Sequence, residues 1–195
     1  MKKQHVTTLT KNDTVQNLTQ KKHVITKPGR YVFILLNWSG TLHVTINTSK
    51  ADVLILGLIN AKRKERYSLS TVQHHKKPDS QSQTIIKIIA QTNSHVTFNG
   101  TIRIEKNAQN TIAKLTNNNL RLSEKSFVSA TPNLEIMPNN VECTHAITTA
   151  SPNTEHIHYI KRKGIEEKQA IKLLTDGFAN SIFQEMKKYD ETINL

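Results

Sequence analysis

The sequence predicts a mainly β fold, with strands stacked along most of the chain and a pair of helices at its carboxyl end. Three observations support this. Hydrophobic residues make up 36% of the 195, and the abundant Ile, Val and Thr favour strands. From Tyr31 onward, short segments alternate apolar and polar residues and are separated by turn residues. From Pro152 the apolar spacing changes to the three and four residues typical of helices.

The strand pattern is clearest before residue 106. Leu42, Val44 and Ile46 occupy every second position, and the apolar residues on either side of Gly100 do the same, so one face of each strand is expected to be buried. After Glu105 the apolar residues are separated by Asn, Ser and Pro, and we expect the strands there to be shorter still. The strands expected in the first part are 31–36, 41–47, 52–59, 66–71, 84–92 and 95–105.

Two architectures accommodate this pattern: a sandwich of hairpins, or a solenoid of short rungs. The chain has six glycines, and Asn-Gly or Asp-Gly dipeptides occur at 99–100 and 176–177 alone, which disfavours many tight hairpins. The run Asn117, Asn118 and Asn119 fits the turns of a stacked solenoid, where amides pair between coils, about as well as it fits a disordered polar loop.

Two helices are expected after Pro152. Asn153 or Thr154 can cap the first, and basic residues at 161–163 followed by Gly164 suit its end. The second begins at about Glu166 and closes with Lys187 and Lys188. Its apolar residues form one stripe, consisting of Ile171, Leu174, Phe178, Ile182 and Met186. This stripe must pack against another surface.

Several classes of protein are excluded by what the sequence lacks. The apolar run at 53–59 is too short to cross a bilayer, and the basic residues 1–14 are followed by polar residues, which does not suit a secretory signal. We therefore expect a cytoplasmic protein or one of an equivalent compartment. Motifs of nucleotide-hydrolysing and nucleophilic enzymes are missing, so the chain is not expected to be an enzyme.

The charge balance is strongly basic, because 27 Lys and Arg oppose 15 Asp and Glu to give a net charge of +12. The basic run at 62–66 invites a nucleic-acid function, but aromatic residues are 5% of the chain, so the usual stacking platform is missing. We interpret the run as a solvated loop. Nucleic acid is not expected as a partner.

Cys143 and His145 are the residues best suited to chemistry. Val141, Cys143, His145 and Ile147 share a face if this segment is a strand, and thiolate with imidazole suits iron, zinc or an iron–sulfur cluster. The alternative, favoured by the spacing alone, is that all four point into a core. A single cysteine also excludes an internal disulfide and any zinc site needing two thiolates from one chain.

The other histidines are weaker candidates for a metal-binding or catalytic role. His74 and His75 adjoin Lys76, Lys77 and Pro78, a stretch without periodicity that we expect to be a surface loop. His156 and His158 are two apart on a helix, where they face different directions, and we expect them on its surface.

A series of short motifs resembles the core of the SufB/SufD family, the scaffold subunits of the SUF machinery for iron–sulfur cluster assembly. The motifs are HKKP at 75–78, Ser82, FNGTI at 98–102, AQNT at 108–111, TNNNL at 116–120, PNLEI at 132–136, VECTHA at 141–146, and HYIKRKGI at 158–165 followed by 174–178. The motif around Cys143 is closer to SufD than to SufB. The cysteine that SufB uses would align near Asn117, and Ala146 replaces the glutamate that follows the histidine in SufB.

The resemblance implies a right-handed parallel β-helix over residues 1–151 with a helical subdomain over 152–195. It also implies a non-catalytic scaffold that pairs with a second copy or a SufB/SufD relative and works with a SufC-like ATPase. The chain is shorter than typical members, which have an amino-terminal helical region and further rungs.

The same resemblance indicates two candidate sites. Cys143 and His145 would contact a cluster or iron. One cysteine cannot supply the four thiolates that a four-iron cluster ordinarily takes, so a bound cluster must be transient and lie at a subunit interface, or use His145 and non-protein sulfur. The carboxyl-terminal helices would bind the ATPase, unless their apolar stripe merely covers the β-helix. The candidate contacts are Ile157, Tyr159, Ile160, Ile171, Leu174, Phe178 and Ile182.

The alternative function is a β-solenoid interaction module that keeps the fold without cluster chemistry and holds no cofactor. The missing cysteine near Asn117 supports it. An enzyme using one metal on Cys143 and His145 lacks a visible third ligand or general base.

Overall fold

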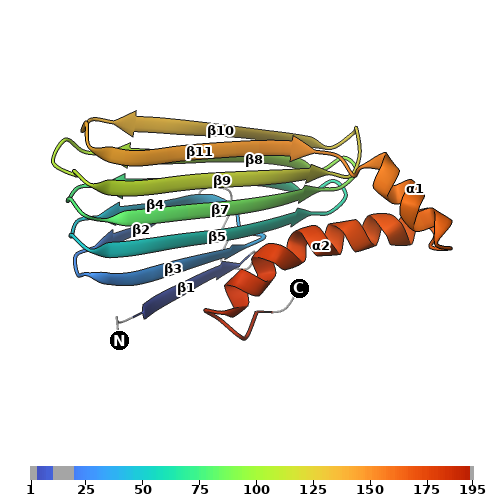
Figure 1. Ribbon diagram of the computed structural model, residues 1–195, viewed down its shortest axis with the longest axis horizontal. Helices are drawn as coiled ribbons and strands as arrows, with labels where there is room; N and C mark the ends of the chain where they lie inside the picture. The colour runs from blue at the N-terminus through green and yellow to red at the C-terminus, as the bar shows by residue number, and fades with distance from the viewer. Residues whose placement is uncertain (1–3, 11–19, 194–195) are drawn as a thin grey trace.

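The computed structural model describes residues 4–10 and 20–193, and the strands in this part of the chain alternate between two stacked sheets (Figure 1). The odd-numbered strands form a six-stranded sheet and the even-numbered strands a five-stranded sheet. The strands are β1 (Gln4–Thr10), β2 (Gln20–Ile25), β3 (Gly29–Leu36), β4 (Gly40–Ile46), β5 (Ala51–Ala61), β6 (Arg66–His75), β7 (Gln81–Ala90), β8 (His95–Ile104), β9 (Thr111–Arg121), β10 (Phe127–Ile136) and β11 (Val141–Ala150).

Every strand pairing in both sheets is parallel, and each strand pairs with the strand two places away in the sequence. Each coil therefore contributes one strand to each sheet, as in a β-solenoid. Paired positions in the later coils lie 29 to 32 residues apart, as the pairs Arg66 with His95 and His95 with Phe127 show. Side-chain bonds join the turns at the same spacing, from Asn110 to Asp79 and from Asn140 to Asn110. The predicted solenoid is confirmed, and a sandwich of hairpins is excluded because hairpins pair antiparallel strands.

The main core fills the space between the sheets, because one face of every strand points inward. Alternate residues such as Leu42, Val44 and Ile46 are fully buried there, as the period of two predicted. Gly100 also lies on this inner face, where a Cβ atom would collide with Leu115 Cδ1 and crowd the ring of Phe98. The Asn-Gly dipeptide therefore serves core packing within β8 and forms no turn.

The expectation of shorter strands after Glu105 is wrong, because β9, β10 and β11 contain 11, 10 and 10 residues. Polar residues are tolerated in these strands because they bond between coils. The run at 117–119 belongs to β9, so it is neither a turn nor a loop. Asn119 Nδ2 donates to Asn117 Oδ1 at 2.8 Å and to Thr149 Oγ1 of the next coil at 3.1 Å.

The carboxyl-terminal helices form as predicted. Asn153 caps α1 (Thr154–Arg162), because its side-chain oxygen accepts a hydrogen bond from the amide of Glu155 at 2.8 Å. Gly164 follows the end of the helix with a positive φ of 84°. α2 (Glu167–Lys187) runs back along the outside of the six-stranded sheet (Figure 1). In the described part of the chain, neither helix is apolar enough along its length to span a membrane.

A second core lies between α2 and that sheet. Ile182, Phe183 and Met186 are buried against apolar residues on the outer faces of β3 and β5, which include Ile34 and Leu56. Burying side chains of this size contributes about 1.5–3 kcal/mol each. The helix thus covers part of the outer face of the six-stranded sheet, whereas no described helix covers the five-stranded sheet.

Candidate functional site

The solenoid ends at β10 and β11, which are the last strands of their sheets in the described part of the chain. Their inward side chains have the preceding coil on one side and no coil on the other. Leu134 and Ile136 of β10 are 38% and 40% exposed, whereas Ile102 and Ile104 at the same register of β8 are fully buried. An exposed apolar end coil of this kind favours association with another protein.

Cys143 and His145 lie on this end coil. Cys143 pairs with the buried Ala113 and His145 with the buried Leu115, so both belong to the inward face of β11. Cys143 is half-buried and packs against the main core, whereas His145 is exposed. Two residues along a strand are separated by about 7 Å, so one ligand could contact both side chains.

Burial raises the pKa of the Cys143 thiol above its ordinary value. The thiol is therefore protonated near neutral pH, and it is not an activated nucleophile. A metal or cluster that binds it must displace the proton, since the thiolate is the ligand.

In residues 4–10 and 20–193, no group of three or more Cys, His, Asp or Glu side chains could together hold a metal ion. Cys143 and His145 would supply at most two ligands to iron. Cluster binding at this position needs further ligands from a second protein or from the cluster's own sulfide.

His74 and His75 do not lie in a loop, because they end β6 and are buried. His75 is inside the solenoid, where its Nδ1 bonds Ser80 Oγ and its Nε2 bonds Ser82 Oγ, both at 2.8 Å. Its burial lowers its pKa to about 4. The local sequence pattern does not reveal that His75 is a buried structural residue, because its two serine partners belong to the next turn and strand. His156 and His158 are exposed on α1, as predicted.

The second candidate surface is the arm formed by α1 and the first half of α2. α1 contains no buried residue, and its Lys161 forms an ion pair with Glu167 of α2 at 2.7 Å. Tyr159 is 64% exposed, while Ile157 and Ile160 are half-buried. The arm projects beyond the sheets (Figure 1), and its apolar side chains are still accessible.

The predicted stripe of α2 is divided between two environments. Ile171 and Leu174 are half-buried in the arm, whereas Ile182 is 3% exposed and contacts the sheet. Phe178 is half-buried at the junction. Leu173, which is 56% exposed, adds to the arm, and the helical stripe missed it because it lies one position from Leu174.

A family model described as the SufBD core domain of SUF system FeS cluster assembly matches residues 2–178. The chain belongs to the SufBD family. This confirms the resemblance of the motifs between residues 75 and 178, and it extends the relationship to the strands before them.

Relatives of this SufBD chain include proteins named for iron–sulfur cluster assembly. SufD of Escherichia coli (strain K12) is 27% identical over 142 residues, which are 73% of this chain and 34% of that protein. A SufBD family protein of Synechocystis is 27% identical over 139 residues, 71% of this chain and 30% of the relative. SufB of Bacillus subtilis is 23% identical over 112 residues, which are 57% of this chain and 24% of that protein. The chain spans about a third of the length of the first two relatives.

The motif resemblance places the cysteine of SufB near Asn117, and the structure shows the surroundings of that residue. Asn117 is fully buried on the inner face of β9, directly beneath Ile147 of the end coil. Its Nδ2 donates to the carbonyl of Ile86 at 3.3 Å. The amide thus has a structural role between coils, and it offers no thiol to a cluster.

Proposed function

We propose that this SufBD chain is a non-catalytic scaffold subunit for the assembly of iron–sulfur clusters, acting with a SufC-like ATPase. The observation that carries the proposal is the position of Cys143 and His145 on the inward face of an uncovered end coil. There a thiol and an imidazole stay accessible beside a surface suited to a partner. The cluster is the cargo of this scaffold.

The end coil would pair with a second copy of the chain or with a SufB/SufD relative. Unpaired edges of β10 and β11 and the exposed Leu134 and Ile136 support this, because pairing would cover backbone groups and apolar surface together. The partner would also bring the missing ligands to Cys143 and His145. A cluster would then form transiently at the seam.

The ATPase would bind the arm. Its candidate contacts are the side chains that the fold leaves accessible, namely Ile157, Tyr159, Ile160, Ile171, Leu173, Leu174 and Phe178. Nucleotide binding can move the arm only if the two states of the ATPase differ in affinity for it. Hydrolysis would occur in the ATPase, and the complex would work in the cytoplasm.

The test is anaerobic reconstitution of the chain co-expressed with a SufC-like ATPase and a SufB relative. We expect C143A and H145A to lose most of the bound iron and acid-labile sulfide. The matched control is Thr144→Ala, because Thr144 is an exposed residue on the opposite face of the same strand. T144A should keep the content of the unmodified complex.

Two outcomes separate the alternatives. Equal iron and sulfide in C143A, H145A and T144A would remove the site assignment. A complex that assembles with its partners but takes up no iron in any form would support the solenoid interaction module without cluster chemistry.

A further inference from the structure

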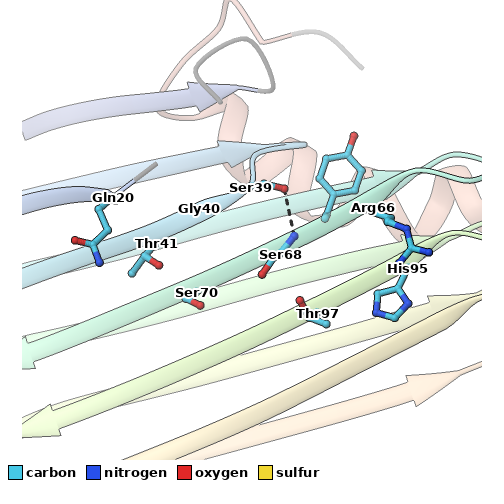
Figure 2. Close-up of a pocket in the computed structure, with 10 residues that line it drawn as sticks. Gln20, Ser39, Gly40, Thr41, Arg66, Ser68, Ser70, His95 and Thr97 are labelled. Atoms are coloured by element: carbon cyan, nitrogen blue, oxygen red, sulfur yellow. Dashed lines mark hydrogen bonds between the residues drawn. The ribbon is translucent and has the colours of Figure 1, made fainter. Parts of the chain in front are cut away.

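A groove of about 570 Å³ lies on the outer face of the five-stranded sheet, at the beginning of β4, β6 and β8. Hydroxyl groups dominate the part shown in Figure 2, and they come from three neighbouring strands: Thr41 from β4, Ser68 and Ser70 from β6, and Thr97 from β8. Arg66 and His95 lie together at one end of this array. This face is distinct from the end coil and from the arm.

The groove exists because β4 is shorter than β6. β4 begins at Gly40, which pairs with Leu69, so residues 66–68 of β6 have β8 on one side and, within the described residues, no strand on the other. On the open side the amide of Ser68 donates to Ser39 Oγ at 3.2 Å. Alternation along a parallel strand directs the amide of Arg66 to the same side. The step thus adds one main-chain donor to the hydroxyls, the amide of Arg66, because the amide of Ser68 is already bonded to Ser39.

Among the described residues, the lining is rich in donors and contains no carboxylate. Glu65 is the nearest acid in the sequence, but its Oε2 accepts the amide of Lys62 at 3.0 Å and the hydroxyl of Tyr67 at 3.3 Å. Arg66 is exposed and forms no ion pair within residues 4–10 and 20–193. A free guanidinium beside several hydroxyls suits a tetrahedral oxyanion, because it can donate two parallel hydrogen bonds.

The surroundings favour an anion as well. Lys62, Arg63 and Lys64 form the exposed turn that leads into Arg66. Clustered positive charges raise the local concentration of anionic ligands and speed their association. The basic run at 62–66, which we interpreted from the sequence as a solvated loop, therefore adjoins a candidate site for an anion.

The size of the groove indicates more than a free ion. A volume of about 570 Å³ lies in the range of sites for small organic ligands. The ring of His95 stacks on Phe127 with centroids 4.3 Å apart and planes 20° from parallel, which leaves a flat rim at one end. A long nucleic acid would instead need a continuous stacking platform, and the groove has one such pair.

We propose that this groove binds the phosphate group of a small ligand, with Arg66 and the hydroxyls of Ser68 and Thr97 as the contacts of the phosphate. The hydroxyl of Ser70 lies further along β6 and would contact the rest of the ligand. The sheet supplies a rigid frame for these donors, so little ordering is needed on binding. The site would operate independently of the cluster, because it faces away from the inner face of β11.

The test is calorimetric titration of the full chain with ribose 5-phosphate, with ribose and inorganic phosphate as separate arms. We expect ribose 5-phosphate to bind and ribose not to bind. R66A should raise Kd at least roughly tenfold, the loss expected for a charge-assisted hydrogen bond. T97V should weaken binding by a smaller factor while keeping the shape of the side chain. Amide shifts in a parallel NMR titration should concentrate at Gly40, Ser68 and Ser70.

The matched control is Arg63→Ala, which removes the same charge from the neighbouring turn at a position that is not part of the described lining. R63A should change Kd less than about twofold at about 150 mM salt, where distant charges are screened. Three outcomes would each overturn the proposal. They are an equal loss of affinity in R63A and R66A, equal binding of ribose and ribose 5-phosphate, and no binding of ribose 5-phosphate. Inorganic phosphate that binds as tightly as the ester would support the phosphate site and assign free phosphate as its ligand.

Discussion

At the scale of the residue, His75 and His145 both lie on the inner faces of strands, yet their surroundings differ. His75 is fully buried between two serine hydroxyls, and its pKa is lowered to about 4. His145 is exposed because no coil follows β11 in the described part of the chain. The same side chain is therefore a structural group in one coil and a candidate ligand in another.

The lowered pKa of His75 predicts that stability falls in acid. Below about pH 6.5 the unfolded chain takes up a proton at this imidazole, whereas the folded chain stays neutral until about pH 4. Between these values the free energy of unfolding should decrease by up to about 3 kcal/mol, since each pKa unit is worth about 1.4 kcal/mol.

Urea unfolding at about pH 7 and about pH 4.5 measures this effect. H75Q should lose less stability than the unmodified protein on acidification, because the titrating group is gone. The control H156Q, at an exposed position of α1, should keep the original pH dependence. An unchanged acid loss in H75Q would contradict the assignment.

At the scale of the element, the 21 residues of α2 combine attachment to the sheet with the proposed binding of an ATPase. Its second half is fixed to the six-stranded sheet by buried apolar side chains. Lys87 of β7 adds to this attachment, because its Nζ donates to the carbonyl of Phe178 at 3.0 Å and lies 4.3 Å from the centre of that ring. The first half leaves the sheet with α1. Any force on the arm would reach the solenoid through this junction.

Two substitutions in α2 should separate these functions. F183A should lower the free energy of unfolding by about 3 kcal/mol, because Phe183 is 5% exposed and packs against the sheet. L173A should change stability by less than about 0.5 kcal/mol, because Leu173 is 56% exposed, but it should weaken binding of the ATPase.

Chemical denaturation and a pull-down with the SufC-like ATPase provide the two measurements. If L173A destabilised the chain as much as F183A, the division of the helix into an anchored and a free half would be wrong.

At the scale of the whole molecule, α2 covers part of one outer face, while nothing in the described part of the chain covers the end coil. Covering that coil with a second protein would bury the same kind of surface that already joins successive coils. The proposed cluster function adds a chemical reason for such an assembly, because the single thiolate of Cys143 cannot by itself supply the four that a four-iron cluster ordinarily takes.

A charge placed on the end coil should therefore prevent self-association without unfolding the monomer. I136E should shift the chain toward a monomer in sedimentation, since Ile136 is 40% exposed and would be buried in a pair. V24E, at a 62% exposed position of β2 far along the solenoid, is the matched control and should leave the oligomeric state unchanged. A dimer that persists in I136E would place the contact elsewhere.

The solenoid architecture was predicted correctly from the sequence, but polar residues that lie in strands were expected in turns or loops. The period of two at residues 42–46 predicted an inner face correctly. The pair His74 and His75 was expected in a loop, and the run at 117–119 in a turn or a loop. The serine partners of His75 belong to the next turn and strand, whereas Asn119 bonds Thr149 of the next coil. Bonds such as His75 to Ser82 and Asn119 to Thr149 satisfy these polar groups, and a local pattern cannot reveal them.

The sequence by itself determined the β-rich body, the capped helical pair and the limit of one thiolate per chain, because these depend on local periodicity and composition. Only the tertiary structure decided which faces are covered. Alternation distinguishes the two faces of a strand, but exposure depends on whether another coil or helix lies beside it. Cys143 and Ala113 share one column of side chains and differ in accessibility for that reason.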